Sequence, residues 1–312
     1  MALIRHLVLC NLTTLYQRLT AMKSIPLPPQ KEWLELKSGL LGGSEVASLF
    51  GIGYRTPLAL YMEKAGLTEP EDLSDVVPVL AGQIFEDSIA ELAAIVRGVS
   101  IHKSELFYLD DERRTCATLD YLFTEEDGST VPVELKFLGS KRDYIPLETE
   151  GDYYPPDKFV IQVQWQLHHM DATHGYLIAM IGNQELMINR IERDQALIDN
   201  LLTAASHFWA NVDSRTPPEP LLPRDYEAVM ALMNRADPTK TMQAFSNLEI
   251  ESLITDYKAA SEAEKAAADA KKTAKAKLLA YMGEAITLET NAGKVTAKIN
   301  KFGNRTMRIT TK

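Results

Sequence analysis

The spacing of hydrophobic positions alternates between a period of two residues and a period near 3.6 up to about residue 212. Strands are expected at 105–109, 116–124, 130–138, 175–181 and 185–191, and helices at 31–38, 80–97, 157–170 and about 194–212. Thr56, Pro57 and Gly66 carry the start and stop signals of a further helix, and Ser44 is expected to cap a short one. Interspersed helices and strands predict an α/β (α+β) protein.

The C-terminal third has a different pattern. The proline-rich stretch 214–225 breaks any regular element, and a polar segment follows to about 245, so a linker is expected at 214–245. Residues 247–283 are rich in Ala, Lys and Glu and predict one helix, roughly 50 Å long at ~1.5 Å per residue. In the residues that follow, apolar and polar side chains alternate as in strands, on either side of a Gly-Asn turn signal. The expected organisation is an extension (1–23), a main domain (24–213), the linker, and a long helix with a small basic hairpin (246–312).

Composition is that of an ordinary globular protein, with 46% apolar and 24% charged residues among 312. Cys10 and Cys116 have no ligand spacing, which argues against a zinc knuckle or a disulfide framework. A net charge of −10 argues against a uniformly basic coat but permits a local basic channel.

The N-terminal apolar run after Arg5 is too short to span a bilayer and lacks a cleavage site, so neither a membrane anchor nor a signal peptide is expected. Met22 is an alternative start, which would make the residues before it a weakly ordered extension.

Candidate chemistry begins at the stretch VPVELKFL, residues 131–138. In a strand, Glu134 and Lys136 share one face while the valines share the other. The turn signal Asp127-Gly128 predicts a hairpin that brings Asp120 on the outgoing strand near Glu134. The alternative is a half-exposed strand with a simple charge pair.

Two carboxylates make a hard oxygen site suited to Mg²⁺, with Mn²⁺ as the other candidate. Glu86, on the preceding helix, is a candidate third carboxylate. Such a metal ion polarises a phosphodiester and lowers the pKa of bound water. Lys136 is placed to position that water or to offset negative charge.

The order of motifs from Trp33 through GGSEVASLFG, GQIFED, ATLDYL, VELK and IQVQWQ resembles the YqaJ-type viral recombinases. These are relatives of phage lambda exonuclease in the PD-(D/E)xK nuclease superfamily. The resemblance covers roughly residues 30–212. It implies a restriction-endonuclease-like mixed central sheet flanked by helices. It also implies metal-dependent 5′ to 3′ digestion of one strand of duplex DNA.

By this resemblance, Asp120, Glu134 and the main-chain carbonyl of Leu135 are metal ligands, and Lys136 is the catalytic lysine. Glu86 matches a helix glutamate near a second metal ion, and Gln162 matches a glutamine beside the active site. Ser44 and Lys37 match the 5′-phosphate pocket. Lys37 stands where lambda exonuclease has an arginine, and lysine lacks the forked contact with phosphate.

The resemblance also implies partners. It implies double-stranded DNA ends as substrate, a single-strand annealing protein, a ring-shaped homotrimer, and the cytoplasm of a bacterial host of a phage or prophage. Competing functions are an endonuclease or repair nuclease of the same superfamily, and a DNA-binding or scaffold protein whose site is idle.

Several residues have simpler interpretations. Ser44 is as well explained as a helix cap as by a phosphate contact. Gln162, Gln164 and Gln166 suit an exposed helix face. His168, His169 and His174 suit surface or helix-end positions. The basic residues after Glu289 are consistent either with DNA contact or with a solvated edge hairpin.

Overall fold

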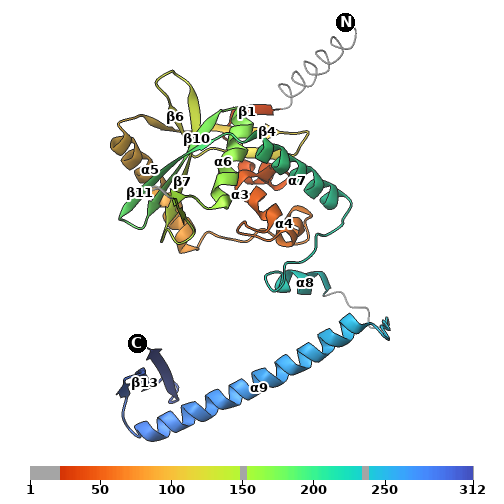
Figure 1. Cartoon of the computed structure of the whole chain (residues 1–312), viewed down its shortest axis with the longest axis vertical. Coiled ribbons are helices and arrows are strands. Elements are labelled where there is room, and N and C mark those ends of the chain that lie inside the picture. Colours follow the sequence, from red (N-terminus) through yellow and green to blue (C-terminus); the bar gives the residue numbers. More distant parts are fainter. Residues whose placement is uncertain (1–21, 148–152, 234–238, 312) are drawn as a thin grey trace. The chain divides into compact units, whose positions relative to one another are not determined.

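The computed structural model describes residues 22–147, 153–233 and 239–311, and the chain divides into two compact units, Met1–Arg235 and Ala236–Lys312. The described helices of unit 1 are α2 (Gln30–Ser38), α3 (Gly43–Val46), α4 (Pro57–Lys64), α5 (Val77–Arg97), α6 (Asp157–Met170), α7 (Gln195–Asp213) and α8 (Tyr226–Met233), with the 3-10 turn η1 (Ala47–Phe50). Its strands are β1 (Met22–Pro26), β2 (Leu41–Gly42), β3 (Ile101–Lys103), β4 (Leu106–Asp110), β5 (Thr115–Thr118), β6 (Tyr121–Thr124), β7 (Thr130–Leu138), β8 (Ile145–Pro146), β9 (Tyr153–Tyr154), β10 (His174–Ile181) and β11 (Glu185–Glu192). Figure 1 labels many of these elements. The expected extension at 1–23 lies outside the described residues except for Met22 and Lys23, which belong to β1.

A five-stranded mixed sheet organises unit 1, in the order β11-β10-β7-β6-β3. β10 is parallel to β7 and antiparallel to β11, while β6 is antiparallel to both β7 and β3. The described part of a second sheet has four strands in the order β1-β4-β5-β2, and β8 pairs with β9. The predicted mixed sheet flanked by helices is therefore confirmed.

Helices cover both faces of the five-stranded sheet. Ile89 and Ala93 of α5 pack with Val133, Leu135 and other side chains of one face. On the other face, α6 contributes Phe159, Val163 and Leu167 to a cluster with Leu177 of β10 and Ile191 of β11. Because side chains alternate along a strand, the polar face of β7 that carries Glu134 lies under α6 rather than in solvent.

The expected strand 116–124 is divided into two. β5 ends at Thr118 and pairs with β4, whereas β6 begins at Tyr121 and pairs with β7 of the other sheet. Leu119 and Asp120 therefore occupy the passage between two sheets. The hydrophobic period continues across this point because both sheets bury the same side of the chain, so periodicity alone does not reveal the break.

Part of the expected linker belongs to unit 1. Asp225 is 1% exposed, and its carboxylate accepts hydrogen bonds from the Thr56 hydroxyl and from the amide of Leu221. Side chains of α8, among them Val229 and Leu232, pack on the core formed around α4 and α7. The apolar positions of α8 bind it to the domain although prolines precede it.

The helix expected at 80–97 forms, but much of its apolar surface stays outside the core. Ile84, Ile95 and Val96 are 68%, 71% and 62% exposed within the described structure. Buried positions are confined to Ile89, Ala90 and Ala93. This exposed apolar stripe of α5 is defined here by Ile84, Ile95 and Val96.

Unit 2 begins with the long helix α9 (Leu248–Met282), which Figure 1 shows as one uninterrupted rod. The Asn247 side chain caps it by accepting from the Ile250 amide at 3.2 Å. Three antiparallel strands follow, β12 (Thr287–Thr290), β13 (Gly293–Ile299) and β14 (Arg305–Thr311). The predicted hairpin is β13–β14, and β12 adds a third strand.

Among the described residues, no helix combines the length and the apolar composition needed to cross a bilayer.

Candidate active site

Asp120 and Glu134 lie beside each other because of the register of the β6–β7 hairpin. Tyr121 pairs with Val133, so Asp120, one residue earlier, comes opposite Glu134. The amide of Leu135 donates to Asp120 Oδ2 at 3.0 Å. The structure thus brings together the two acids that the hairpin signal predicted to meet.

Both carboxylate oxygens of Glu134 have partners. Glu134 is only 1% exposed. The ammonium of Lys136 donates to its Oε1, and the amide of Gln166 donates to its Oε2 at 2.5 Å. Gln166 Oε1 is buried without a hydrogen-bond partner in the described structure. The Glu134 carboxylate is therefore held from two sides.

The three glutamines of α6 have different surroundings. Gln162 is partly buried, whereas Gln164 and Gln166 are 2% and 1% exposed. Gln164 bonds the carbonyl of Glu192 at 2.6 Å and the amide of Asp194 at 2.9 Å, which ties α6 to the start of α7. The exposed-face interpretation is wrong for these two. The site role of Gln166 was missed, although its spacing of four residues from Gln162 places both on one helix face.

Negative charge is crowded around the hairpin. Burial and the charge of Glu134 raise the pKa of the Asp120 carboxyl well above its ordinary value. Burial likewise raises the pKa of Glu86. Burial alone would lower the pKa of Lys136, but the carboxylates of Glu134 and Asp120 raise it. When ionised, Asp120, Glu134 and Lys136 together carry one negative charge, which favours a bound cation.

The donor set fits a hard divalent cation through two side chains. Asp120 and Glu134 offer carboxylate oxygens, and no described donor bonds Asp120 Oδ1. The described residues contain no group of three His, Cys, Asp or Glu side chains near enough to share a metal ion. Glu86 is therefore not gathered into one ligand set with the other two acids. Its carboxylate lies 3.8 Å from the Lys103 ammonium.

A pocket of about 330 Å³ connects most of the candidate residues. Its lining includes Asp120, Glu86, Gln162, Ser44 and Lys37. Glu134 and Lys136 are not part of the lining. Asp120, which lies beside Glu134, is the residue of this group that lines the pocket. The arrangement places acidic groups and a lysine-serine pair on one shared cavity.

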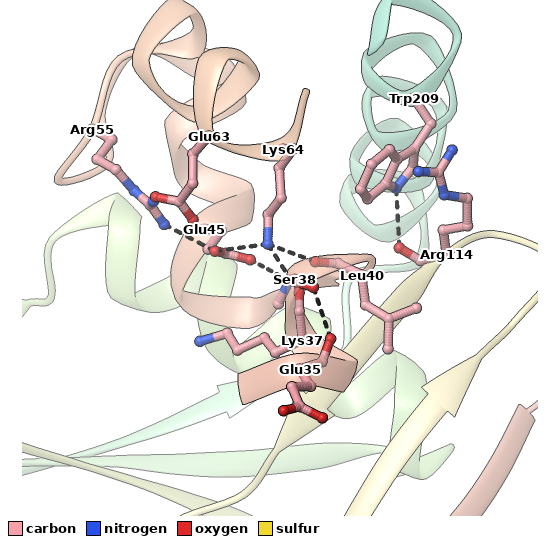
Figure 2. Close-up of polar contacts among 11 residues, drawn as sticks. Glu35, Lys37, Ser38, Leu40, Glu45, Arg55, Glu63, Lys64, Arg114 and Trp209 are labelled. Carbon is pink, nitrogen blue, oxygen red and sulfur yellow. Dashed lines mark hydrogen bonds and ion pairs between the residues drawn. The ribbon is translucent and has the colours of Figure 1, made fainter. Parts of the chain in front are cut away.

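The short helix α3, which carries Ser44, is held by Glu45, which is 4% exposed. Figure 2 shows the ion pairs and hydrogen bonds around the Glu45 carboxylate. Glu45 Oε2 accepts from the Gly42 amide at 2.9 Å. Its Oε1 lies 2.9 Å from Arg55 Nη2 and 3.2 Å from Lys64 Nζ. Burial by itself raises the pKa of Glu45, but nearby Lys64, the other cations and the Gly42 amide lower it overall.

Lys64 links this network to the helix that carries Lys37. Its ammonium donates to the carbonyls of Lys37 at 3.0 Å and Leu40 at 2.8 Å (Figure 2). The Lys64 side chain is 2% exposed, so these bonds lie inside the protein. The Lys37 ammonium itself lies 4.8 Å from the centroid of the Trp33 ring.

Ser44 is not the helix cap that the sequence predicted. The cap position of α3 is Gly42, and the Glu45 carboxylate supplies the bond to its amide. The described residues form no hydrogen bond with the Ser44 hydroxyl. A Cβ on Gly43 would come within 3.2 Å of the Trp165 ring, so glycine permits the loop to lie against α6. The Ser44 hydroxyl is left available to the pocket.

The histidines have structural surroundings. His169 is 4% exposed and bonds the carbonyl of Trp165 at 2.8 Å and the Thr115 hydroxyl at 3.1 Å. Burial lowers its pKa to about 4 and that of His168 to about 3. His174 contacts Glu125 at 2.9 Å and is 8% exposed. Surface positions were wrong for His169 and His174, although His168 and His169 do lie in the last turn of α6.

Residues 32–173 match the family model of the YqaJ-like viral recombinase domain. Protein YqaJ of Bacillus subtilis (strain 168) is 25% identical over 182 residues, which cover 57% of this chain and 54% of that protein. The chain thus spans about half the length of that relative. The resemblance inferred from the motif order is confirmed for the segment that matches.

Two solved structures are similar at lower identity. An alkaline exonuclease (LHK-Exo) from Laribacter hongkongensis is 18% identical with a TM-score of 0.45, covering 65% of this chain and 98% of its own. A phage-related exonuclease from Haemophilus somnus 129PT is 13% identical with a TM-score of 0.40, covering 56% and 96%.

Proposed function

We propose that this chain, whose residues 32–173 match the family model of the YqaJ-like viral recombinase domain, is a metal-dependent deoxyribonuclease. It digests one strand of linear duplex DNA from the 5′ end and leaves 3′ single strands for recombination by strand annealing. The observation that carries the proposal is the buried set of Asp120, Glu134 and Lys136 behind a pocket that also reaches Lys37 and Ser44.

The carboxylates of Asp120 and Glu134 would hold Mg²⁺, or Mn²⁺ in its place, with the Leu135 carbonyl as a further ligand. When bound, such an ion supplies Lewis acidity at the phosphodiester and lowers the pKa of an attacking water. Glu86, on the same pocket, would contact a second ion or its water shell rather than join the first ligand set.

Lys136 would act through its ammonium, which the neighbouring carboxylates keep protonated. A protonated lysine cannot serve as a general base. Its proposed role is therefore to orient the water and to offset negative charge on the phosphorane-like transition state. Gln166 fixes Glu134 from the opposite side, and Gln162 lines the pocket where the scissile strand would pass.

Lys37 and Ser44 would hold the terminal 5′-phosphate. The ammonium supplies charge and the hydroxyl supplies a hydrogen bond, both at the pocket lining. Lysine lacks the paired donors of arginine, so the proposed preference for a 5′-phosphate is moderate rather than strict.

The proposed assembly is a homotrimeric ring acting with a single-strand annealing protein, in the cytoplasm of a bacterial host of a phage or prophage. Ile84, Ile95 and Val96 support association between copies, because exposed apolar stripes of this kind are typical of interfaces. A ring around DNA would explain processive digestion.

The decisive experiment follows an end-labelled linear duplex with Mg²⁺, with and without a 5′-phosphate. Stepwise release of nucleotides from the 5′-labelled strand is expected, faster with the phosphate, and none with EDTA. A covalently closed circle of the same sequence should stay intact. Cutting of the circle would instead support an endonuclease.

Asp120→Asn tests the site, and Asp127→Asn in the exposed hairpin turn is the matched control. Asp120→Asn should lower the rate by at least about a hundredfold, while the control should retain it. Full activity of Asp120→Asn would refute the assignment, and inactivity of the unaltered protein with every divalent ion would favour an idle scaffold.

A further inference from the structure

The charge of the chain is distributed unevenly. Between residues 270 and 311 there are nine lysines and arginines, and the only acids are Glu284 and Glu289. The whole protein has a net charge of −10. Such an asymmetry within one chain is typical of a segment that binds a polyanion.

The register of the C-terminal sheet gathers part of this charge on one face. Along β13, Lys294, Thr296 and Lys298 alternate with Val295 and Ala297. The two apolar residues are buried in a cluster with Met282 of α9. The polar residues therefore share the outer face of the sheet.

The neighbouring strand continues the same face. Thr306, Arg308 and Thr310 of β14 pair with Lys298, Thr296 and Lys294 in turn, and paired residues project to the same side. Thr306, Arg308 and Thr310 are all exposed. The outer face is defined by these three residues with those of β13, which are all hydroxyl-bearing or cationic. On β12, Glu289 pairs with Lys294 and adds one carboxylate at the margin of this face.

Protection of a sheet edge does not explain the lysines of β13. Lysines guard edge strands against pairing with other chains, but β13 is the central strand of the three described. Lys294 forms a 2.8 Å ion pair with Glu289. Within the described residues, Lys298 and Arg308 form no ion pair. Two cations on the outer face are thus left without a neutralising partner.

We propose that this outer face binds the phosphate backbone of duplex DNA, without reading its sequence. Lys298 and Arg308 supply the charge, and the hydroxyls of Thr296 and Thr310 are hydrogen-bond donors to phosphate oxygens. The Thr306 hydroxyl donates instead to the carbonyl of Lys298 at 3.1 Å. The face has no aromatic side chain, which single-stranded binding surfaces use to stack bases. The inference rests on the proposed function only in taking DNA as the ligand. The surface consists only of residues of unit 2, whereas the residues assigned to cleavage belong to unit 1.

The test measures affinity of the full-length protein for a fluorescent duplex of about 30 base pairs in EDTA, over a series of salt concentrations. The variant Lys298→Gln/Arg308→Gln removes two cations from the outer face. Lys258→Gln/Lys265→Gln removes two exposed cations from the N-terminal half of α9 and is the matched control. Each phosphate contact contributes about 0.9 to the slope of log affinity against log salt.

The outer-face variant should therefore have a slope smaller by about 1.8, and at low salt an affinity lower by on the order of tenfold per lost contact. The control should match the unaltered protein. Lys298→Arg/Arg308→Lys, which keeps both charges, should restore binding and excludes a general effect on folding. Equal slopes for the outer-face variant and the control would overturn the proposal. Tighter binding of a single-stranded oligothymidine with the same loss in the variant would overturn the duplex assignment.

Nuclease activity is measured separately with Mg²⁺. DNA binding with the expected slopes but without cleavage would refute the proposed nuclease function and support the assignment of DNA binding to the outer face. Cleavage, together with a slope of the outer-face variant equal to that of the unaltered protein, would support the nuclease function and refute that assignment.

Discussion

Replacing Lys136 by methionine removes the ammonium that faces two acids in the interior. The size of the effect depends on whether this group behaves as a surface pair or a buried one. Exposed ion pairs contribute about 0–1 kcal/mol, whereas breaking a buried pair costs about 3–5 kcal/mol. The Lys136 side chain is 19% exposed and that of Glu134 is 1% exposed. The pair therefore behaves as a buried one, with a cost near the lower end of the range for buried pairs. We expect Lys136→Met to lower the free energy of unfolding by about 3 kcal/mol at alkaline pH.

The loss should depend on pH, because Asp120 has a raised pKa. An acid whose pKa is raised on folding stabilises the folded state below its unfolded pKa, and this contribution is lost as pH rises through the folded pKa. Without Lys136, the Asp120 pKa rises further. The variant should therefore be closest to the unaltered protein at acidic pH, where Asp120 is protonated, and fall furthest behind at alkaline pH.

Urea unfolding followed by tryptophan fluorescence in EDTA measures this directly, because all three tryptophans, Trp33, Trp165 and Trp209, lie in unit 1. A loss of about 3 kcal/mol corresponds to a midpoint lower by about 1 M or more. Lys141→Met, which breaks the exposed pair with Glu185, is the control and should leave the midpoint nearly unchanged.

A double-mutant cycle with Glu134→Gln then isolates the pair. The double variant should be less destabilised than the sum of the single variants by about 1–3 kcal/mol. Added Mg²⁺ should stabilise Lys136→Met more than the unaltered protein, since the cation replaces the missing positive charge. Equal stability of Lys136→Met and the unaltered protein at alkaline pH would refute the buried charge arrangement.

Three further predictions concern the pocket. Lys64→Met should lower the free energy of unfolding by about 3 kcal/mol, because it leaves Glu45 with one cation fewer in the interior. The same variant should discriminate less between phosphorylated and unphosphorylated 5′ ends. Urea titration measures the first effect, which an unchanged midpoint would contradict, and an end-competition assay measures the second. Lys37→Arg should increase the preference for a 5′-phosphate by about threefold or more, because guanidinium binds phosphate through two donors. A preference equal to that of the unaltered protein would argue against phosphate contact at this position. Mg²⁺-dependent cleavage should rise with pH as Asp120 loses its proton, because the pKa of this carboxyl is raised well above its ordinary value and a metal ligand must be ionised. A flat profile of kcat/KM against pH would show that this ionisation does not limit the reaction.

Local patterns predicted the elements and the hairpin. The turn signal at Asp127-Gly128 and the alternation of 131–138 were sufficient to place Asp120 near Glu134, because a tight turn fixes the register of the strands that it joins. They were not sufficient to show that Asp120 sits between two sheets. That depends on β4 and β7 as competing partners, which are distant in sequence from each other.

Tertiary contacts explain what the patterns missed. Gln166 and His169 are polar residues on a helix, and polarity alone predicts exposure. Both are buried because α6 packs between sheets, where Glu134 and Thr115 supply their hydrogen-bond partners. The stripe of Ile84, Ile95 and Val96 shows the converse, since apolar character alone favours burial and the described chain does not cover these side chains.

Two ionic clusters have opposite net charge, and each contributes one residue to the lining of the same pocket, Asp120 and Lys37. Asp120, Glu134 and Lys136 carry a surplus negative charge when ionised, whereas Glu45 and Glu63 face three cations, Arg55, Lys64 and Lys37. Burying either cluster costs desolvation energy that hydrophobic side chains would avoid. Under the proposed function, Asp120 and Glu86 of the pocket lining would attract a divalent cation, and Lys37 of the same lining would attract a phosphate. That polarity would orient a phosphorylated strand end before any chemistry occurs.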